Sequence, residues 1–164
     1  DGGVVQGDDW RLTALHTPGH CGNHLCFAMD GTAGNFFSAD MVMGWSTSVV
    51  SPPDGDMAAY MNSLERLIAR GDADRMYLCG HGPRLPEPAP YLAALKAHRL
   101  EREAKTLEAL RTAGTATAAE LVPPVYGPLD PRLVGPAGRS LLSHLIKLEG
   151  EGAVVREGKR WRTR

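Results

Sequence analysis

The sequence predicts a protein of the α/β class with a second, smaller domain after it. Between residues 10 and 79, short apolar runs typical of strands alternate with an amphipathic helical stretch. After residue 90 the helical pattern dominates and ends in a hairpin pattern. The formal charge of -1 conceals a balance of -5 (6 basic, 11 acidic) over residues 1–97 and +4 (12 basic, 8 acidic) over residues 98–164. We therefore expect domains at 1–97 and 98–164.

Four strands and one helix are expected in the first domain. Alternating apolar residues predict a strand at 10–15, and mostly apolar runs predict strands at 24–29, 35–39 and 75–79. Apolar residues at helical spacing predict an amphipathic helix over 56–70. Either Asp54 or Asp56 is suited to cap its N-terminus, and Gly71 to end it.

The second domain reads as helical with a terminal hairpin. A long helix is expected at 90–112, a short one at 117–121 and another at 139–148. Several prolines and a glycine over 123–131 predict an irregular connection, and residues 153–162 predict a small β-hairpin. Three helices followed by a basic hairpin is the order of a winged-helix module.

The composition excludes several classes of protein. A hydrophobic fraction of 43% and a charged fraction of 23% are those of a globular chain rather than a disordered one. No apolar run approaches the roughly 20 residues of a membrane span, so no membrane partner is expected. Three cysteines without a CxxC pair favour a reducing, cytoplasmic location. The chain opens Asp1-Gly2-Gly3 without an initiator Met, which favours a piece of something longer.

Three side chains suited to a metal follow predicted strands. His20 lies in the turn after the first strand, Asp40 comes directly after the strand at 35–39, and His81 follows the strand at 75–79, between two glycines. If these ends meet at one sheet edge, two imidazoles and one carboxylate gather there, a set that suits Zn, Mn or Fe. Taken singly, each has a bland alternative: a histidine at the surface, or an aspartate that caps a turn.

The same segments carry a family resemblance. His16 to His24 (HTPGHCGNH), Ala39 to Gly44 (ADMVMG) and Gly80 to Pro83 (GHGP) resemble, in order, three motifs of the metallo-β-lactamase-fold hydrolases. Asp54 to Leu67 and the arginines near residue 100 resemble the branch with a C-terminal winged-helix domain. The resemblance implies the C-terminal half of an αββα sandwich, followed by a small winged-helix-like domain.

The resemblance also implies roles. His20 would belong to a first metal site, His81 to a second, and Asp40 would bridge two zinc ions, with Mn or Fe as alternatives. A metal-held hydroxide would attack an ester, thioester, lactone or phosphodiester of a small-molecule substrate. His24 is expected to contact the metal-ligand residues without binding a metal itself, or to pack in the interior. His16 is expected to be structural.

Other positions keep two interpretations. Trp45, Ser46 and Thr47 would line a substrate pocket, or Ser46 and Thr47 belong to a loop with local hydrogen bonds. Arg99 and Arg102 would join helix and sheet by ion pairs, with a phosphate role as the alternative.

One expected motif is absent: His-x-His-x-Asp-His occurs nowhere in the sequence. In the family that this chain resembles, that motif supplies further metal ligands from the N-terminal half of the fold. We therefore expect the partner to be a missing N-terminal half or a second copy of the chain in a homo-oligomer. Two other functions stay open: an endoribonuclease-like protein that binds single-stranded RNA through the basic C-terminal part, and an inactive fragment.

Overall fold

A mixed six-stranded sheet forms the first part of the chain in the computed structural model, which describes residues 1–31 and 34–164. The strands follow sequence order across the sheet: β1 (Val4–Gln6), β2 (Arg11–His16), β3 (Leu25–Asp30), β4 (Asn35–Ala39), β5 (Met76–Cys79) and β6 (Leu85–Pro86). Only β4 and β5 pair in parallel, and the crossover between them contains α1 (Met57–Ile68) and a short 3-10 turn, η1 (Gly71–Ala73). The four predicted strands and this helix are confirmed, with ends shifted by one or two residues.

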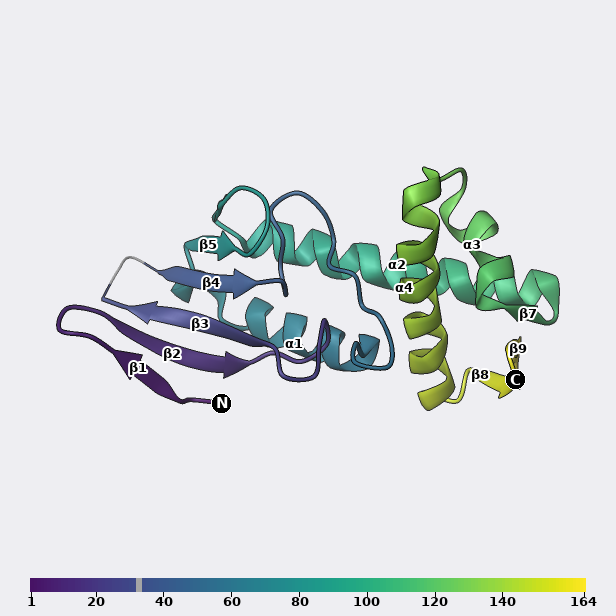
Figure 1. Ribbon diagram of the computed structural model, residues 1–164, viewed down its shortest axis with the longest axis horizontal. Coiled ribbons are helices and arrows are strands. Elements are labelled where there is room, and N and C mark those ends of the chain that lie inside the picture. Colours follow the sequence, from purple (N-terminus) through teal and green to yellow (C-terminus); the bar gives the residue numbers. More distant parts are fainter. Residues whose placement is uncertain (32–33) are drawn as a thin grey trace.

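One face of the sheet is covered by helices. Cys26, Phe36 and Tyr77 project from β3, β4 and β5 into a cluster with the apolar side of α1 and the start of the long helix α2 (Ala89–Ala113). Asp56 caps α1, since its carboxylate accepts the backbone N–H of Ala59. Burial of these apolar side chains holds the sheet and α1 together as two packed layers (Figure 1).

The opposite face of the sheet is apolar and less well covered. The strand register places Phe27 opposite Phe37, and Phe37 opposite Leu78. The side chains of Phe27 and Leu78 are only partly buried, and Phe37 is 36% exposed. An exposed row of this kind on a sheet is a surface to which another layer can pack.

The second part of the chain has its own core. It consists of the distal half of α2, a two-residue strand β7 (Ala116–Thr117), α3 (Ala118–Tyr126), α4 (Pro131–Gly150) and the hairpin β8 (Val154–Glu157) and β9 (Arg160–Thr163). Trp161 is buried among Leu110, Leu121 and Leu141. Helix α2 extends from the first core to the second (Figure 1). The predicted division at 97/98 lies inside α2 and stays a prediction.

The expectation of an irregular connection over residues 123–131 is wrong in part. Helix α3 continues through Pro123 and Pro124 to Tyr126, and α4 begins at Pro131, eight residues before the predicted start. Burial of Leu121, Val122 and Val125 against α4 outweighs the poor helix propensity of the prolines. The three short strands β1, β6 and β7 carry no sequence signal strong enough to predict them.

Candidate metal centre

Three strands bring the candidate ligands to one edge of the sheet. Because β3 runs antiparallel to both β2 and β4, and β5 runs parallel to β4, the carboxyl ends of β2, β4 and β5 lie at the same edge. His20, Asp40 and His81 follow those three strands. The topology therefore gathers the three residues as the sequence predicts.

The carboxylate of Asp40 lies between the two imidazoles. Nε2 of His20 is 3.8 Å from Oδ2 of Asp40, and Nε2 of His81 is 3.5 Å from Oδ1. Two ligand atoms on one tetrahedral Zn²⁺, with bonds of about 2.0–2.1 Å, are about 3.3 Å apart. The two separations are close to that spacing, and each oxygen faces a different imidazole. The donor set thus fits a carboxylate that bridges two metal ions.

The ring of His20 is oriented by a backbone contact. Its Nδ1 is 2.8 Å from the carbonyl oxygen of Val49. Donation of the Nδ1 proton to this carbonyl leaves the lone pair on Nε2, the atom that faces Asp40. Metal-binding histidines are commonly held by such a contact at the second ring nitrogen.

His24 lies behind the carboxylate rather than beside it. Its Nε2 accepts the backbone N–H of Asp40 at 3.2 Å, and its Nδ1 is 2.9 Å from the hydroxyl of Thr17. Burial, together with the neighbouring imidazole of His20, lowers the pKa of His24. A neutral ring with both nitrogens engaged can fix the Asp40 backbone. This contact is consistent with a supporting role, which stays a prediction.

The loop that carries Asp40 is held tightly at both ends. Ala39 has φ +45°, a left-handed conformation that costs a residue with a Cβ about 1–2 kcal/mol. The strand pairing shifts between Phe37 and Ala39, so the chain turns sharply before Asp40. The hydroxyls of Tyr60 and Tyr91 then donate to the carbonyls of Met41 and Met43. These two tyrosines carry no local signal that would have linked them to the site.

Glycines let the Asp40 and His81 loops approach each other. A Cβ on Gly44 would lie 2.0 Å from the carbonyl oxygen of Pro83, and one on Gly80 would lie 2.7 Å from Oδ1 of Asp40. The backbone N–H of Gly44 donates to the carbonyl of His81 at 2.9 Å. The glycines of the two motifs are therefore required by the distance between the loops.

We expect the Gly44→Ala substitution to separate these loops. The new methyl group has no room beside Pro83, so His81 would move away from Asp40. Metal affinity should fall by about 10–100-fold, as when an orienting contact of a ligand is lost. Isothermal titration of the chain, combined with an N-terminal half of the fold, with Zn²⁺ measures this affinity. Gly3→Ala is the control for the loss of a glycine, because a Cβ there meets nothing within 4 Å and the backbone has no positive φ. Unchanged affinity in Gly44→Ala would contradict the steric argument.

The remaining predicted site residues lie in different places. His16 is at the end of β2, with its Nε2 2.9 Å from the carbonyl oxygen of Gly22, and so braces the loop that carries His20. Trp45 is 73% exposed, next to Gly82. Ser46 and Thr47 line a cavity between their loop and the helices of the second part of the chain.

The three candidate ligands do not by themselves form a complete metal centre. Across residues 1–31 and 34–164, no group of three or more His, Cys, Asp or Glu side chains meets the requirements of a metal site. The two oxygens of Asp40 face different imidazoles, so each candidate metal position would receive one nitrogen and one oxygen from this chain. Further ligands must come from elsewhere in a working site.

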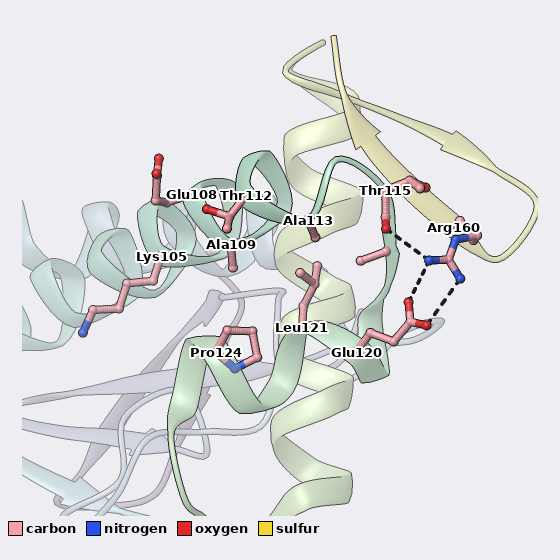
Figure 2. A pocket seen from close by; sticks show the side chains of 11 residues that line it. Lys105, Glu108, Ala109, Thr112, Ala113, Thr115, Glu120, Leu121, Pro124 and Arg160 are labelled. Carbon is pink, nitrogen blue, oxygen red and sulfur yellow. Dashed lines mark hydrogen bonds and ion pairs between the residues drawn. The ribbon is translucent and has the colours of Figure 1, made fainter.

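A second cavity lies near the C-terminal end of α2, within the second part of the chain. It measures about 570 Å³ between α2, α3 and β9 and has an apolar floor that includes Ala109 and Leu121. Figure 2 shows Arg160 at its rim, paired with Glu120 and with the carbonyl of Thr115. Its lining contains two carboxylates, Glu108 and Glu120, but no histidine or cysteine.

The basic hairpin is largely engaged in contacts within the chain. Arg160 pairs with Glu120, Arg162 pairs with Glu157, and the guanidinium of Arg156 lies over the ring of Trp161. These contacts leave less positive charge free for phosphates than the count of basic residues suggests.

Comparison with known proteins gives consistent results. Residues 117–161 match the family described as "Beta-lactamase associated winged helix domain". An atrochrysone carboxyl ACP thioesterase of Aspergillus chevalieri is 31% identical over 98% of this chain and 54% of its own length. A beta-lactamase-like protein 2 homolog of Drosophila melanogaster is 32% identical over 87% of this chain and 47% of its own.

The structural comparison agrees. A metallo-beta-lactamase family protein from Thermus thermophilus superposes on 100% of this chain and 53% of its own, with a TM-score of 0.85 and 27% identity. The chain therefore spans about half the length of the relatives it matches. In the part of the chain described here, no helix is long and apolar enough to cross a membrane.

The fold and the three motifs define a metallo-β-lactamase-fold protein, and the chain belongs to that superfamily. Within it, the chain belongs to the branch that carries a winged-helix domain, as the resemblance indicates. The predicted α/β class with a terminal winged helix is thereby confirmed. The relatives are named as thioesterases and lactamase-like proteins, and do not favour the RNA-binding alternative.

Proposed function

We propose that this chain supplies half of the active site of a metal-dependent hydrolase that cleaves an ester or thioester of a small-molecule substrate. The observation that carries the proposal is the placement of the Asp40 carboxylate between the imidazoles of His20 and His81. The thioesterase names of several relatives support the reaction class and favour a thioester over a lactone or phosphodiester. The fold alone would not select a reaction, because this architecture hosts many.

The chain's own residues have separable tasks in this proposal. His20 and His81 would each hold a metal ion, and the carboxylate of Asp40 would contribute to both positions. Bound metal ions would supply Lewis acidity, which would polarise the scissile carbonyl and lower the pKa of bound water toward neutral pH. Val49 and His24 orient His20 and the Asp40 backbone, so that the donor atoms are in place before a metal binds.

Zinc is the proposed metal, with manganese or iron as the alternatives. Imidazole nitrogens and a carboxylate are ligands that all three accept. The separations of 3.5 and 3.8 Å between donor atoms suit the short bonds and tetrahedral geometry of zinc.

The remaining ligands would come from an N-terminal half of the fold that packs on the open sheet face. The row formed by Phe27, Phe37 and Leu78 is the surface available for it. The expected partner is therefore that half, with self-association of this face as the alternative outcome for the chain on its own.

The proposal is tested by combining the chain with a separately produced N-terminal half that carries His-x-His-x-Asp-His. We expect about two metal ions per complex and hydrolysis of a model thioester, with neither property in the separate halves. Size-exclusion chromatography of the chain alone reports whether it self-associates. A complex that forms without binding metal, or a His20→Ala complex with undiminished activity, would refute the proposal.

A further inference from the structure

A positively charged cavity lies between the Asp40–Val50 loop and the second part of the chain. It has a volume of about 200 Å³, several times the roughly 30 Å³ of one water molecule. Its lining includes the cationic side chains of Arg99 and Arg102, together with polar residues from three segments: Ser46, Thr47, Tyr126 and Ser140. No aspartate or glutamate is among the residues that line it.

The expected ion pairs of Arg99 and Arg102 are wrong. Among the residues that the structure describes, neither guanidinium has a carboxylate within 4.0 Å. Arg99 instead donates to the carbonyl of Ser48 and lies over the ring of Tyr60, 5.0 Å from its centroid. Arg102 donates to the carbonyl of Val125. Both charges are therefore held in place by neutral partners and are not neutralised.

Arg99 is buried and Arg102 is partly buried, which is unusual for cations without a carboxylate partner. Arg99 is only 4% exposed, and its Nε is buried without a hydrogen-bond partner. The Nε of Arg102 is also buried without one. A buried charge costs several kcal/mol unless it is paired.

The neighbouring histidine responds to the same field. Burial, followed by the charges of Arg102 and Arg99, lowers the pKa of His98, which lines the cavity. The two guanidinium groups add to the effect of burial on the pKa of His98, as is expected at a site of positive potential.

The cavity is connected to the candidate metal centre through two residues of one loop. Ser48 donates its hydroxyl to the carbonyl of Asp40 and accepts a hydrogen bond from Arg99 at its own carbonyl. Val49 accepts from His20 and also lines the cavity. A ligand in the cavity would thus lie next to the loop that positions His20 and Asp40.

The geometry points to a binding site for a phosphate group in this cavity. Two planar guanidinium groups and several hydroxyls match the charge and the multiple acceptor oxygens of a phosphate better than a single carboxylate. We assign it to a phosphate carried by the substrate, at a distance from the bond that is cleaved. Only this assignment to substrate rests on the proposed function; the binding of phosphate does not.

The decisive comparison is a pair of substitutions at Ser140, which is on α4 and lines the cavity. Ser140→Asp and Ser140→Asn differ in charge but hardly in size. We expect the chain to bind inorganic phosphate saturably in a ³¹P NMR titration. Ser140→Asp should weaken binding by about tenfold or more, because a carboxylate competes for the guanidinium groups, whereas Ser140→Asn should change it less than about threefold.

A second pair of variants controls for misfolding that substitutions at the buried Ser140 could cause. Thr47→Asp and Thr47→Asn place the same charge difference on the more exposed loop side of the cavity. Arg111→Leu, which removes a positive charge from the exposed last turn of α2, should leave phosphate binding unchanged. Equal affinity in the Asp and Asn variants at both positions, or no saturable binding by the wild-type chain, would overturn the proposal.

A second probe distinguishes a phosphodiester from a terminal phosphate as the group that the site binds. Dimethyl phosphate carries one charge and two ester groups, whereas inorganic phosphate carries up to two charges and no ester. Tighter binding of dimethyl phosphate would assign the site to a phosphodiester, and tighter binding of inorganic phosphate to a terminal phosphate. Because neither titration requires metal or hydrolysis, a failed thioesterase assay would leave the result intact.

Discussion

Replacing Asp40 with asparagine is expected to reduce hydrolysis by the complete fold by about 10³-fold or more, equal to roughly 4 kcal/mol of transition-state stabilisation. The amide keeps the size of the side chain and one oxygen, but it removes the negative charge and the second oxygen. Since each oxygen of Asp40 faces a different imidazole, the loss affects both halves of the site at once.

Metal content separates this explanation from a general loss of folding. The Asp40→Asn complex should hold fewer than two metal ions by mass spectrometry while its circular dichroism spectrum stays that of the wild type. Asp72→Asn, in the exposed η1 turn, is the matched control and should retain both metals and activity. An Asp40→Asn complex with two metals and near-normal rates would show that the carboxylate does not bridge.

The gathering of the candidate ligands could be predicted because it follows from sheet topology. His20, Asp40 and His81 each follow a strand, and strands that run in the same direction end at the same edge. The contacts that orient them could not be predicted in this way. Val49 lies 29 residues from His20, and Ser48 lies 51 residues from Arg99, so only the tertiary fold brings these pairs together.

The second part of the chain shows a different limit of sequence analysis. Prolines at 123, 124 and 136 are strong local signals against a helix, and yet α3 and α4 run through them. Local propensity is a weak term compared with burial, and the side chains of Leu121, Val125 and Leu141 are almost fully buried. The same non-local packing leads Arg99 and Arg102 to carbonyl and aromatic partners rather than to the predicted carboxylates.

A partly buried polar cluster between α2 and α4 carries the largest expected effect on stability. Glu103 accepts from Nζ of Lys147 at 2.7 Å and lies 3.2 Å from Nδ1 of His144, which is 1% exposed. We expect Glu103→Leu to cost about 3 kcal/mol, because removal of the carboxylate leaves the buried ring of His144 without a hydrogen-bond partner and Lys147 with one acceptor fewer. Lys147 keeps its bond to Glu151, which holds the cost near the low end of such losses.

The cluster also predicts how stability changes with pH. Although burial opposes ionisation, the hydrogen bonds from His144 and Lys147 hold the pKa of Glu103 below its ordinary value. Its contribution is therefore present above the ordinary glutamate pKa and is lost as the pH falls through the lowered one. Burial lowers the pKa of His144, so the unfolded chain takes up a proton first as the pH falls below 6.5, and stability falls there too.

Both groups act in the same direction, so the melting temperature should fall steadily from about pH 7 to about pH 4. In Glu103→Gln the part of this fall below about pH 5 should shrink, because the glutamine has no proton to gain. Glu101→Gln, on the exposed side of α2, should leave the pH profile nearly unchanged, because solvent screens its pair with Lys105. Calorimetry at a series of pH values measures all three proteins. If the melting temperature of Glu103→Gln falls as much as that of the wild type down to about pH 4, ionisation of Glu103 does not cause this pH dependence of stability.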